Sequence, residues 1–282
     1  MRKSRNLVDP RGFEPLTYRL PVCRAPNCAT GPRRVEMCPL RIPPPSAGSV
    51  VAATIPWENM QTRDIASTEL KGGGYLALPD GDGPHPGVVV IHEEHGLTEH
   101  IKEVTRRLAG AGYAALAVDL FTDRVRALCM ARYMTGLLMG RVNFYGIDDL
   151  KSAMTFLAKL PDVDAQRLGA VGFCMGGGFA IAWACTDSRL KAIAPFYATN
   201  PRPLAVTRRL CPVVGSYPEK DFTARGARAL DKELAAANIE HDIKIYPGTY
   251  HAFFNEAGRN HDREASQDAW NRVLAFFGDR LG

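Results

Sequence analysis

The sequence of 282 residues lacks any run of 18 consecutive apolar residues, which is about the minimum length for a membrane-spanning helix. It also lacks the core of a secretory signal, because no apolar segment follows the basic residues at positions 2 and 3. The seven cysteines show no paired spacing, and unpaired thiols are typical of reducing compartments. These absences predict a cytoplasmic protein with no membrane partner.

An excess of positive charge is present in only one part of the chain. The formal net charge of +5 comes from 35 Lys+Arg and 30 Asp+Glu. Residues 1–59 hold nine basic and four acidic residues and therefore carry the whole excess. Residues 60–282 are formally neutral, so their net charge does not indicate a nucleic-acid partner.

The first 59 residues have few apolar runs and contain ten of the 20 prolines. Such a composition cannot offset the entropy of ordering, so we expect a disordered leader. Residues 11–17 (RGFEPLT) resemble a peptide that is seen at mis-called gene starts, and Met60 is then a candidate true start. Nucleic-acid binding by the basic leader is the alternative. Its three cysteines lack the spacing and histidines of a zinc site.

From residue 60 onward, short strand patterns alternate with helical patterns. The expected strands are apolar runs bounded by turn residues, over residues 87–92, 114–119, 167–172, 190–196, 211–215 and 240–246. The expected helices have apolar residues every three or four positions, over residues 98–111, 124–140, 146–160, 176–185, 222–237 and 266–281. This alternation predicts an α/β fold: one domain over residues 60–282 with a mainly parallel sheet covered by helices on both faces. Ligands bind such sheets at the carboxyl ends of the strands.

The first candidate for chemistry is a glycine-rich segment, Gly172–Gly178 (GFCMGGG), between an expected strand and an expected helix. It fits a G-x-nucleophile-x-G turn with Cys174 as the nucleophile. Flanking glycines allow the strand and helix backbones to approach closely, and a helix N-terminus favours a thiolate. A buried structural cysteine and a phosphate-binding loop are the alternatives for this segment.

Two further candidates follow later strands, Asp221 in residues 217–222 and His251 in residues 246–253. Taken singly, Asp221 could cap the next helix and His251 could be a solvated loop residue. With Cys174 they occur in the order nucleophile, acid, base, which is the order of the α/β-hydrolase triad. In that arrangement His251 takes and returns the thiol proton, and Asp221 orients the imidazole.

These segments resemble the dienelactone hydrolase (carboxymethylenebutenolidase) family. The resemblance runs from about residue 66 to the C-terminus and rests on three stretches, which are GFCMGGG around Cys174, KDF around Asp221 and YHAF around His251. It implies an α/β-hydrolase fold and hydrolysis through a thioester on Cys174.

The resemblance includes a fourth element, residues 92–97 (HEEHGL), after the first long strand. In the family, a glutamate at this point contacts the resting thiol and couples its activation to substrate binding, which implies Glu93 here. Glu94 then donates a backbone N–H to the oxyanion hole, with the Met175 N–H as the second donor. An ordinary loop carboxylate is the alternative for Glu93. His92 and His95 do not have the spacing of a zinc motif, so we expect no metal and no other cofactor.

The family also implies arginines that hold a substrate carboxylate. The candidates are Arg132 and Arg124, with Arg126 and Arg141 in the same region. Bidentate guanidinium–carboxylate pairing would account for such a role, and surface solvation is the alternative. Residues 123–140 depart from the pattern of the best-studied members, which leaves the substrate open.

The sequence therefore predicts a hydrolase of ester or lactone bonds with a Cys174–His251–Asp221 triad. The resemblance implies a carboxylate-bearing enol lactone, such as dienelactone, as the substrate. A broader carboxylesterase or thioesterase of the same fold is the near alternative, and a non-catalytic, redox-sensing thiol protein is the alternative from another class. We expect a small-molecule ester or lactone as the partner, no nucleic acid, and a monomer or small homo-oligomer.

Overall fold

The computed structural model describes residues 60–122, 125–139 and 142–282. The predicted leader over residues 1–59 lies outside this range. The described strands form one sheet: β1 (Gln61–Ile65), β2 (Gly74–Leu78), β3 (His85–Ile91), β4 (Ala114–Val118), β5 (Val163–Phe173), β6 (Leu190–Phe196), β7 (Val213–Lys220) and β8 (His241–Tyr250). The helices are α1 (Glu99–Gly110), α2 (Arg126–Leu138), α3 (Ile147–Leu157), α4 (Met175–Ala184), α5 (Thr223–Ala236) and α6 (Arg263–Leu281), with a short 3-10 helix η2 (Leu204–Arg209).

The sheet has the strand order β1-β2-β4-β3-β5-β6-β7-β8. All pairings from β4 to β8 along this order are parallel. Each of the six strands predicted from the sequence corresponds to one of β3–β8, and the strand predicted over residues 190–196 coincides with β6. The expected α/β architecture with a mainly parallel sheet is therefore confirmed.

The sequence did not predict strands β1 and β2, which extend the sheet by two antiparallel pairings. Four of the five residues of β1 are exposed, so this edge strand has no apolar run to reveal it. Strand β2 is almost wholly buried, but it is only five residues long. It directly follows Lys71, Gly72 and Gly73, which are typical of a turn.

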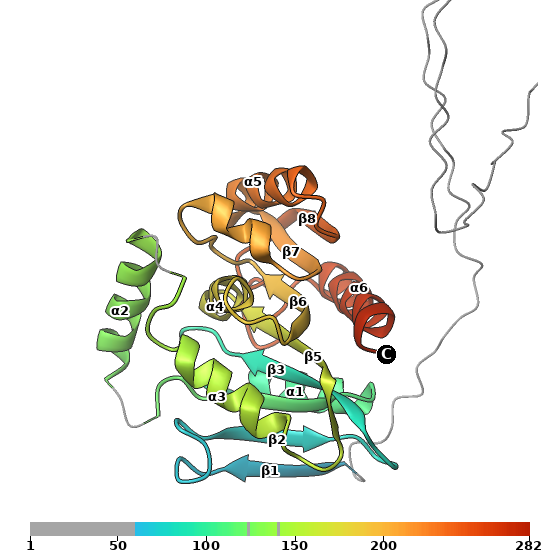
Figure 1. Ribbon diagram of the computed structural model, residues 1–282. Coiled ribbons are helices and arrows are strands. Elements are labelled where there is room, and N and C mark those ends of the chain that lie inside the picture. The colour runs from blue at the N-terminus through green and yellow to red at the C-terminus, as the bar shows by residue number, and fades with distance from the viewer. Residues whose placement is uncertain (1–59, 123–124, 140–141) are drawn as a thin grey trace, which may run out of the picture. The chain divides into compact units, whose positions relative to one another are not determined.

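The helices cover the two faces of the sheet (Figure 1). Helices α1 and α6 contribute Ile101 and Phe277 to the core on one face, whereas α3, α4 and α5 contribute residues such as Leu150 and Phe179 to the core on the other. Helix α2 contacts this second layer through Tyr133, whose ring lies 4.8 Å from that of Phe179. No helix of the described residues is long and apolar enough to cross a membrane.

The parallel strands determine where polar side chains gather. Strands β3, β5, β6, β7 and β8 point in the same direction, so their carboxyl ends meet at one edge of the sheet. Cys174, Tyr197, Asp221 and His251 directly follow these ends, and Glu93 is the second residue after β3. The fold thus brings together residues that are up to 158 positions apart in the chain.

Candidate active site

Cys174 occupies a strained turn between β5 and α4. Its backbone has φ 53° and ψ −113°, a conformation that L-residues adopt only where the surrounding structure imposes it. A Cβ on Gly172 would lie 2.2 Å from the Gly176 carbonyl oxygen, and a Cβ on Gly176 would lie 2.2 Å from the Ile91 carbonyl oxygen. Only glycine fits at these two positions, so the G-x-C-x-G spacing reflects the close approach of three backbone segments.

Cys174, His251 and Asp221 form a continuous chain of hydrogen bonds. The Cys174 Sγ lies 3.1 Å from His251 Nε2, and His251 Nδ1 lies 2.6 Å from Asp221 Oδ2. Because an ionised carboxylate only accepts hydrogen bonds, Nδ1 carries the proton and Nε2 faces the thiol as an acceptor. The structure therefore brings together the three residues that the sequence placed in a triad.

The same contacts show that the capping role considered for Asp221 is also present. Asp221 Oδ1 accepts a hydrogen bond from the Thr223 backbone N–H at 2.7 Å, at the start of α5. The Asp221 side chain is only 4% exposed. Its two oxygens are thus divided between the helix and the imidazole, and the helix contact holds the carboxylate in the position that orients His251.

Aromatic rings hold the imidazole of His251 in place. The Phe222 ring lies nearly parallel to it, with an interplanar angle of 12° and a centroid separation of 5.8 Å. The Tyr197 ring lies 5.0 Å from it. These contacts restrict the rotation of the imidazole without removing it from solvent, because the His251 side chain is 30% exposed.

The thiol is protonated in the resting site. Burial raises the pKa of Cys174, and the negative charge and hydrogen bond of Glu94 raise it further. The Met175 backbone N–H opposes this by lowering the pKa, with a smaller effect. A thiol of this kind needs a base at the moment of attack, rather than being a preformed thiolate.

His251 and Asp221 have pKa values that suit a base and its orienting acid. Burial acts to lower the pKa of His251, but the hydrogen bond and charge of Asp221 more than offset it, so the pKa is raised above 6.5. Burial acts to raise the pKa of Asp221, but the hydrogen bonds from His251 and Thr223 lower it below its ordinary value. Asp221 is therefore ionised in the folded protein at neutral pH, as an orienting carboxylate must be.

Glu93 is buried, but its contacts differ from those that the resemblance implied. It is 5% exposed, and its two oxygens accept hydrogen bonds from Tyr197 Oη at 3.0 Å and Asn255 Nδ2 at 3.1 Å. Burial raises the pKa of Glu93, and these two hydrogen bonds partly oppose the shift. The negative charge of Glu93 raises the pKa of the Cys174 thiol less than that of Glu94 does.

Glu94 lies beside the thiol, where the sequence placed a backbone donor to an oxyanion. The contact to the Cys174 thiol comes from the Glu94 carboxylate. The Met175 N–H lies next to the sulfur at the first position of α4, and a helix N-terminus presents free N–H groups. The role of the Glu94 and Met175 N–H groups as an oxyanion hole stays a prediction.

The flanking histidines have structural contacts. His92 is fully buried, with Nδ1 2.5 Å from the Glu93 carbonyl oxygen and Nε2 3.0 Å from the Leu120 N–H. His95 is exposed, and its Nδ1 lies 3.0 Å from Arg126 Nη2. Both nitrogens of His92 are thus occupied by protein groups, which accounts for the residue without a metal.

The candidate arginines do not share one place. Arg124 and Arg141 lie outside the described residues. Arg132 lines a cavity of 470 Å³ with Lys71 and Asp148, and its guanidinium lies 5.9 Å from the Tyr145 ring. This cavity shares no lining residue with the triad, so a role for Arg132 in holding substrate stays a prediction.

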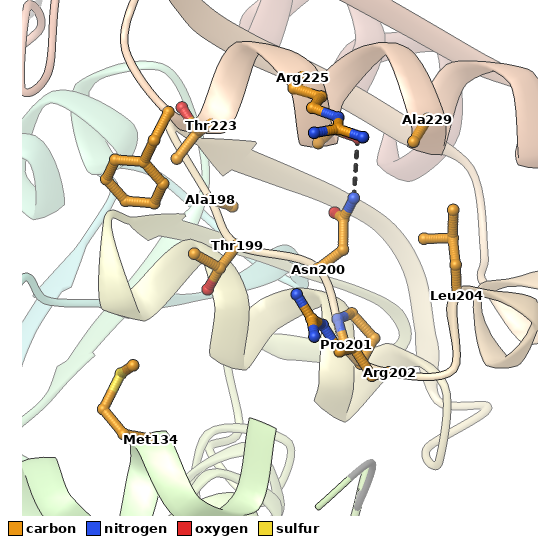
Figure 2. Close-up of a pocket in the computed structure, with 12 residues that line it drawn as sticks. Met134, Ala198, Thr199, Asn200, Pro201, Arg202, Leu204, Thr223, Arg225 and Ala229 are labelled. Carbon is orange, nitrogen blue, oxygen red and sulfur yellow. Dashed lines mark hydrogen bonds between the residues drawn. The ribbon is translucent and has the colours of Figure 1, made fainter. Parts of the chain in front are cut away.

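Two cavities adjoin the triad. The larger, of 540 Å³, is lined by Phe222 and Thr223 among others, and the smaller, of 200 Å³, is lined by Glu93, Glu94 and His251. Figure 2 shows the larger one, between helix α5 and the segment that follows β6. The larger cavity is thus bordered by the two residues that follow Asp221, and the smaller one by His251 itself.

Sequence reasoning missed two residues of the site, Tyr197 and Asn255. Tyr197 directly follows β6 and has a positive φ of 38°, so its place after a buried strand was a signal of the same kind as that of Glu93. Asn255 lies four positions after His251 in a loop, and nothing in its sequence context indicates a contact with Glu93. Asn255 and Glu93 meet only because the folded chain places the loop after β8 beside the segment that follows β3.

Comparisons with known proteins by sequence and by structure both lead to the family that the sequence motifs resemble. Residues 73–281 match the model of the dienelactone hydrolase family. A protein of Saccharolobus solfataricus named "Putative carboxymethylenebutenolidase" is 31% identical over 238 residues, which cover 72% of this chain and 91% of the relative. The crystal structure of a dienelactone hydrolase-like promiscuous phosphotriesterase from metagenomic libraries superimposes with a TM-score of 0.68 at 25% identity, covering 79% of this chain and 99% of that one.

Proposed function

The chain belongs to the dienelactone hydrolase family, and we propose that it hydrolyses ester or lactone bonds with Cys174 as the nucleophile. The observation that supports this most directly is the unbroken contact from Cys174 Sγ through His251 to Asp221. Because the pKa of Cys174 is raised and that of Asp221 is lowered, at neutral pH the thiol carries the proton that His251 is to accept, and Asp221 carries the charge that stabilises the imidazolium. The substrate class that follows from the family is a small enol lactone such as dienelactone.

Acylation begins with proton transfer from the thiol. As Sγ attacks the carbonyl carbon, His251 Nε2 accepts the proton across the 3.1 Å contact. Asp221 stabilises the imidazolium that forms. The negative oxygen of the tetrahedral intermediate is placed against the Met175 and Glu94 N–H groups, where oriented donors stabilise developing charge.

Collapse of the intermediate breaks the bond to the leaving oxygen, and His251 returns the proton to it. In a lactone the leaving oxygen stays part of the same molecule, so the ring opens while the acyl group remains on Cys174. Water then attacks the thioester with His251 as the base, releasing the acid and restoring the thiol. No redox change or external cofactor enters this cycle.

A broader esterase or thioesterase is the second candidate, because the larger cavity of 540 Å³ exceeds the needs of a small lactone. The structural relative described as a promiscuous phosphotriesterase makes phosphotriesters worth including among the test substrates. A redox sensor is less favoured, since sensor thiols have a lowered pKa and burial raises that of Cys174.

The test is a turnover screen of the full chain on dienelactone, 4-nitrophenyl acetate, a thioester and a phosphotriester. We expect Cys174→Ala to lose at least ~10³-fold in kcat/KM on every ester that the parent hydrolyses. Cys211→Ala is the matched control, because Cys211 is also a partly buried free thiol but lies before β7, away from the triad. Circular dichroism checks that both variants are folded.

Three results distinguish the proposed function from its alternatives. Loss of activity in Cys174→Ala alone supports the proposal, and the preferred ester in the panel separates a lactonase from a general esterase. Unchanged turnover in Cys174→Ala overturns it. Trapping of a thioester by hydroxylamine during turnover distinguishes nucleophilic attack by Cys174 from general-base attack by water.

A further inference from the structure

Large exposed apolar side chains are concentrated at helix α2 and next to it. Of the six such side chains in the described part of the chain, five belong to Val125, Leu128, Met134, Met139 and Phe222. Leu128 and Met134 lie on α2, and Val125 and Met139 directly flank it. Phe222, which is 73% exposed, precedes α5. We call these five residues the α2 surface. Exposed apolar groups that gather in one place mark a surface that binds another molecule.

Helix α2 is apolar on its outer side as well as on its inner side. The inner side is formed by Cys129 and Tyr133, which are buried. With 3.6 residues per turn, Ala131 lies on the side opposite to these two, and Met134 and Leu128 lie on either side of Ala131. All three are exposed. A helix that is apolar on both sides is normally buried, so a second molecule is expected to cover the outer side of α2.

The α2 surface extends to the triad through Phe222. Met134 and Phe222 both line the cavity of 540 Å³, and Figure 2 shows Met134 on α2 across this space from Arg225 on α5. The ring of Phe222 also lies nearly parallel to the imidazole of His251, with a centroid separation of 5.8 Å. A molecule that covers the α2 surface therefore lies beside the catalytic base.

The charged side chains next to the α2 surface are positive. Helix α2 has two arginines, Arg126 and Arg132, which are both exposed, and it has no acidic residue. Arg202 and Arg225 are the charged residues that line the cavity, and no aspartate or glutamate of the described residues lines it. Apolar groups with positive groups around them are complementary to a partner that is both apolar and negatively charged.

These charges argue against a second copy of this chain as the partner. In a twofold dimer the same surface of each copy meets that of the other. Two α2 helices packed through Ala131 would bring Arg132 of one copy close to Arg132 of the other. Like charges across an interface cost free energy, and α2 has no acidic residue to offset them. A bilayer with anionic headgroups avoids this conflict, because its phosphates meet the guanidinium groups while its acyl chains receive the apolar side chains.

We infer that the α2 surface binds the surface of an anionic lipid bilayer, with α2 lying in the plane of the headgroups. Leu128, Met134 and Phe222 enter the lipid, and the surrounding arginines bind headgroup phosphates. The sequence predicts no membrane partner because it has no membrane-spanning segment, but binding at a lipid surface needs none. The inference goes beyond the proposed function, since it concerns where the protein binds and not which bond it breaks.

The test is cosedimentation of full-chain Cys174→Ala with lipid vesicles. One set of vesicles is phosphatidylcholine alone, and the other has equal parts of phosphatidylcholine and phosphatidylglycerol. We expect the partition coefficient to be at least about tenfold higher for the anionic vesicles, and to fall as added salt screens the attraction. Because Cys174→Ala needs no turnover for this measurement, failure of the proposed function would not change the result.

The apolar contact is tested by replacing Leu128→Gln and Met134→Gln together in this background. The partition coefficient should fall about tenfold or more, because two side chains that enter the lipid become polar. The matched control exchanges the two residues, Leu128→Met with Met134→Leu, which keeps the surface apolar and should leave the partition coefficient within about twofold. Both positions are about half exposed, and circular dichroism checks that both variants are folded.

The ionic contact is tested by Arg202→Gln and Arg225→Gln. Each should lower the partition coefficient for anionic vesicles about fivefold, as expected for one arginine at an anionic lipid surface. Arg263→Gln is the matched control, because Arg263 is exposed at the start of α6, which covers the opposite face of the sheet from α5. Its replacement should change the partition coefficient less than about twofold.

Three results would overturn the inference. The first is that Cys174→Ala does not bind anionic vesicles at low ionic strength, which would leave an acidic segment of another protein as the partner. The second is that binding persists unchanged in Leu128→Gln with Met134→Gln, which would assign it to the basic residues 1–59. The third is an equal loss of binding in Arg225→Gln and Arg263→Gln, which would show an effect of net charge alone.

Discussion

His251 Nδ1 donates a hydrogen bond to Asp221 Oδ2 over 2.6 Å, while the other oxygen of Asp221 is fixed by the Thr223 N–H. This relationship joins a helix start to the imidazole that faces the thiol. It sets the tautomer of His251, its orientation and its pKa at once. The carboxylate stabilises the protonated imidazole, so the residue titrates above its ordinary 6.5.

Asp221→Asn is expected to change both the rate and its pH dependence. In the parent, kcat/KM should rise with pH through a midpoint above 6.5, because His251 is a base only once it has lost its proton. Without the negative charge that raises the pKa of His251, the midpoint should move to lower pH. The rate should fall about 10³-fold or more from loss of the correct tautomer. A pH–rate profile measures both effects, and a midpoint that stays in place would contradict the role given to Asp221.

Glu94→Gln is expected to make the thiol more reactive toward neutral alkylating agents. The negative charge of Glu94 raises the pKa of Cys174, so its removal should lower that pKa and increase the thiolate fraction. We expect iodoacetamide to react about threefold faster or more at pH 8.

Glu93→Gln provides the comparison for Glu94. Glu93 acts on the pKa of Cys174 more weakly, and Tyr197 and Asn255 hold its oxygens. Its replacement should therefore change the alkylation rate less. A larger acceleration in Glu93→Gln than in Glu94→Gln would reverse the assignment and return the contact with the resting thiol to Glu93.

Gly172→Ala should disrupt the turn that carries the nucleophile. The added Cβ would lie 2.2 Å from the carbonyl oxygen of Gly176, and a backbone atom cannot move aside as a side chain does. We expect the free energy of unfolding in urea to fall by about 3 kcal/mol or more.

Gly278→Ala is the matched change at an open position. Nothing lies within 4 Å of a Cβ at Gly278, which is inside α6. Alanine there should raise the free energy of unfolding by about 0.5–1 kcal/mol, because it reduces the backbone entropy of the unfolded chain. If both variants behaved alike, close backbone contact would not be what requires glycine at position 172.

His100 should make the protein sensitive to mild acid. Its ring lies 6.0 Å from those of Phe173 and Phe254, its Nε2 is buried without a partner among the described residues, and burial lowers its pKa from 6.5 to about 4. Above pH 6.5 the imidazole is neutral in both the folded and the unfolded chain, so it does not lower the free energy of unfolding. As the pH falls from 6.5 toward 4, the unfolded chain takes up the proton first, so stability is lost by about 2 kcal/mol.

His100→Leu should lose less stability than the parent over that interval. Urea denaturation at several pH values between 7 and 4 measures the difference between the two proteins. Carboxylates also titrate in this pH range, but they are the same in the parent and in His100→Leu, so their effect on the free energy of unfolding cancels when the two proteins are compared. Parallel curves would show that the buried imidazole does not govern the acid response.

Much of the site could be predicted because its signals are local. Cys174 lies in a strand–turn–helix segment whose glycines are required by contacts of 2.2 Å, and Asp221 and His251 each directly follow a strand. A parallel sheet brings strand ends to one edge whatever the details of the connections. Knowing the order of strands and of these residues was therefore sufficient to group them.

The rest depended on contacts between loops, which leave no pattern in the sequence. HEEHGL contains two adjacent glutamates, and only the path of the chain after β3 turns Glu93 toward Tyr197 and Asn255 and places Glu94 at the thiol. The exposed edge strand β1 was not predicted for a related reason. Its residues pair with β2 through the backbone, and four of its five side chains are exposed.

The sequence by itself determined the α/β alternation, the nucleophile turn and the order of the triad, because periodicity and glycine placement act over a few neighbouring residues. Only the tertiary structure decided which glutamate adjoins the thiol and which arginines border the cavity of 540 Å³. Arg202 and Arg225 are separated by 22 intervening residues and look like any surface arginines in the sequence. Their common cavity exists because the segment after β6 and helix α5 pack against each other.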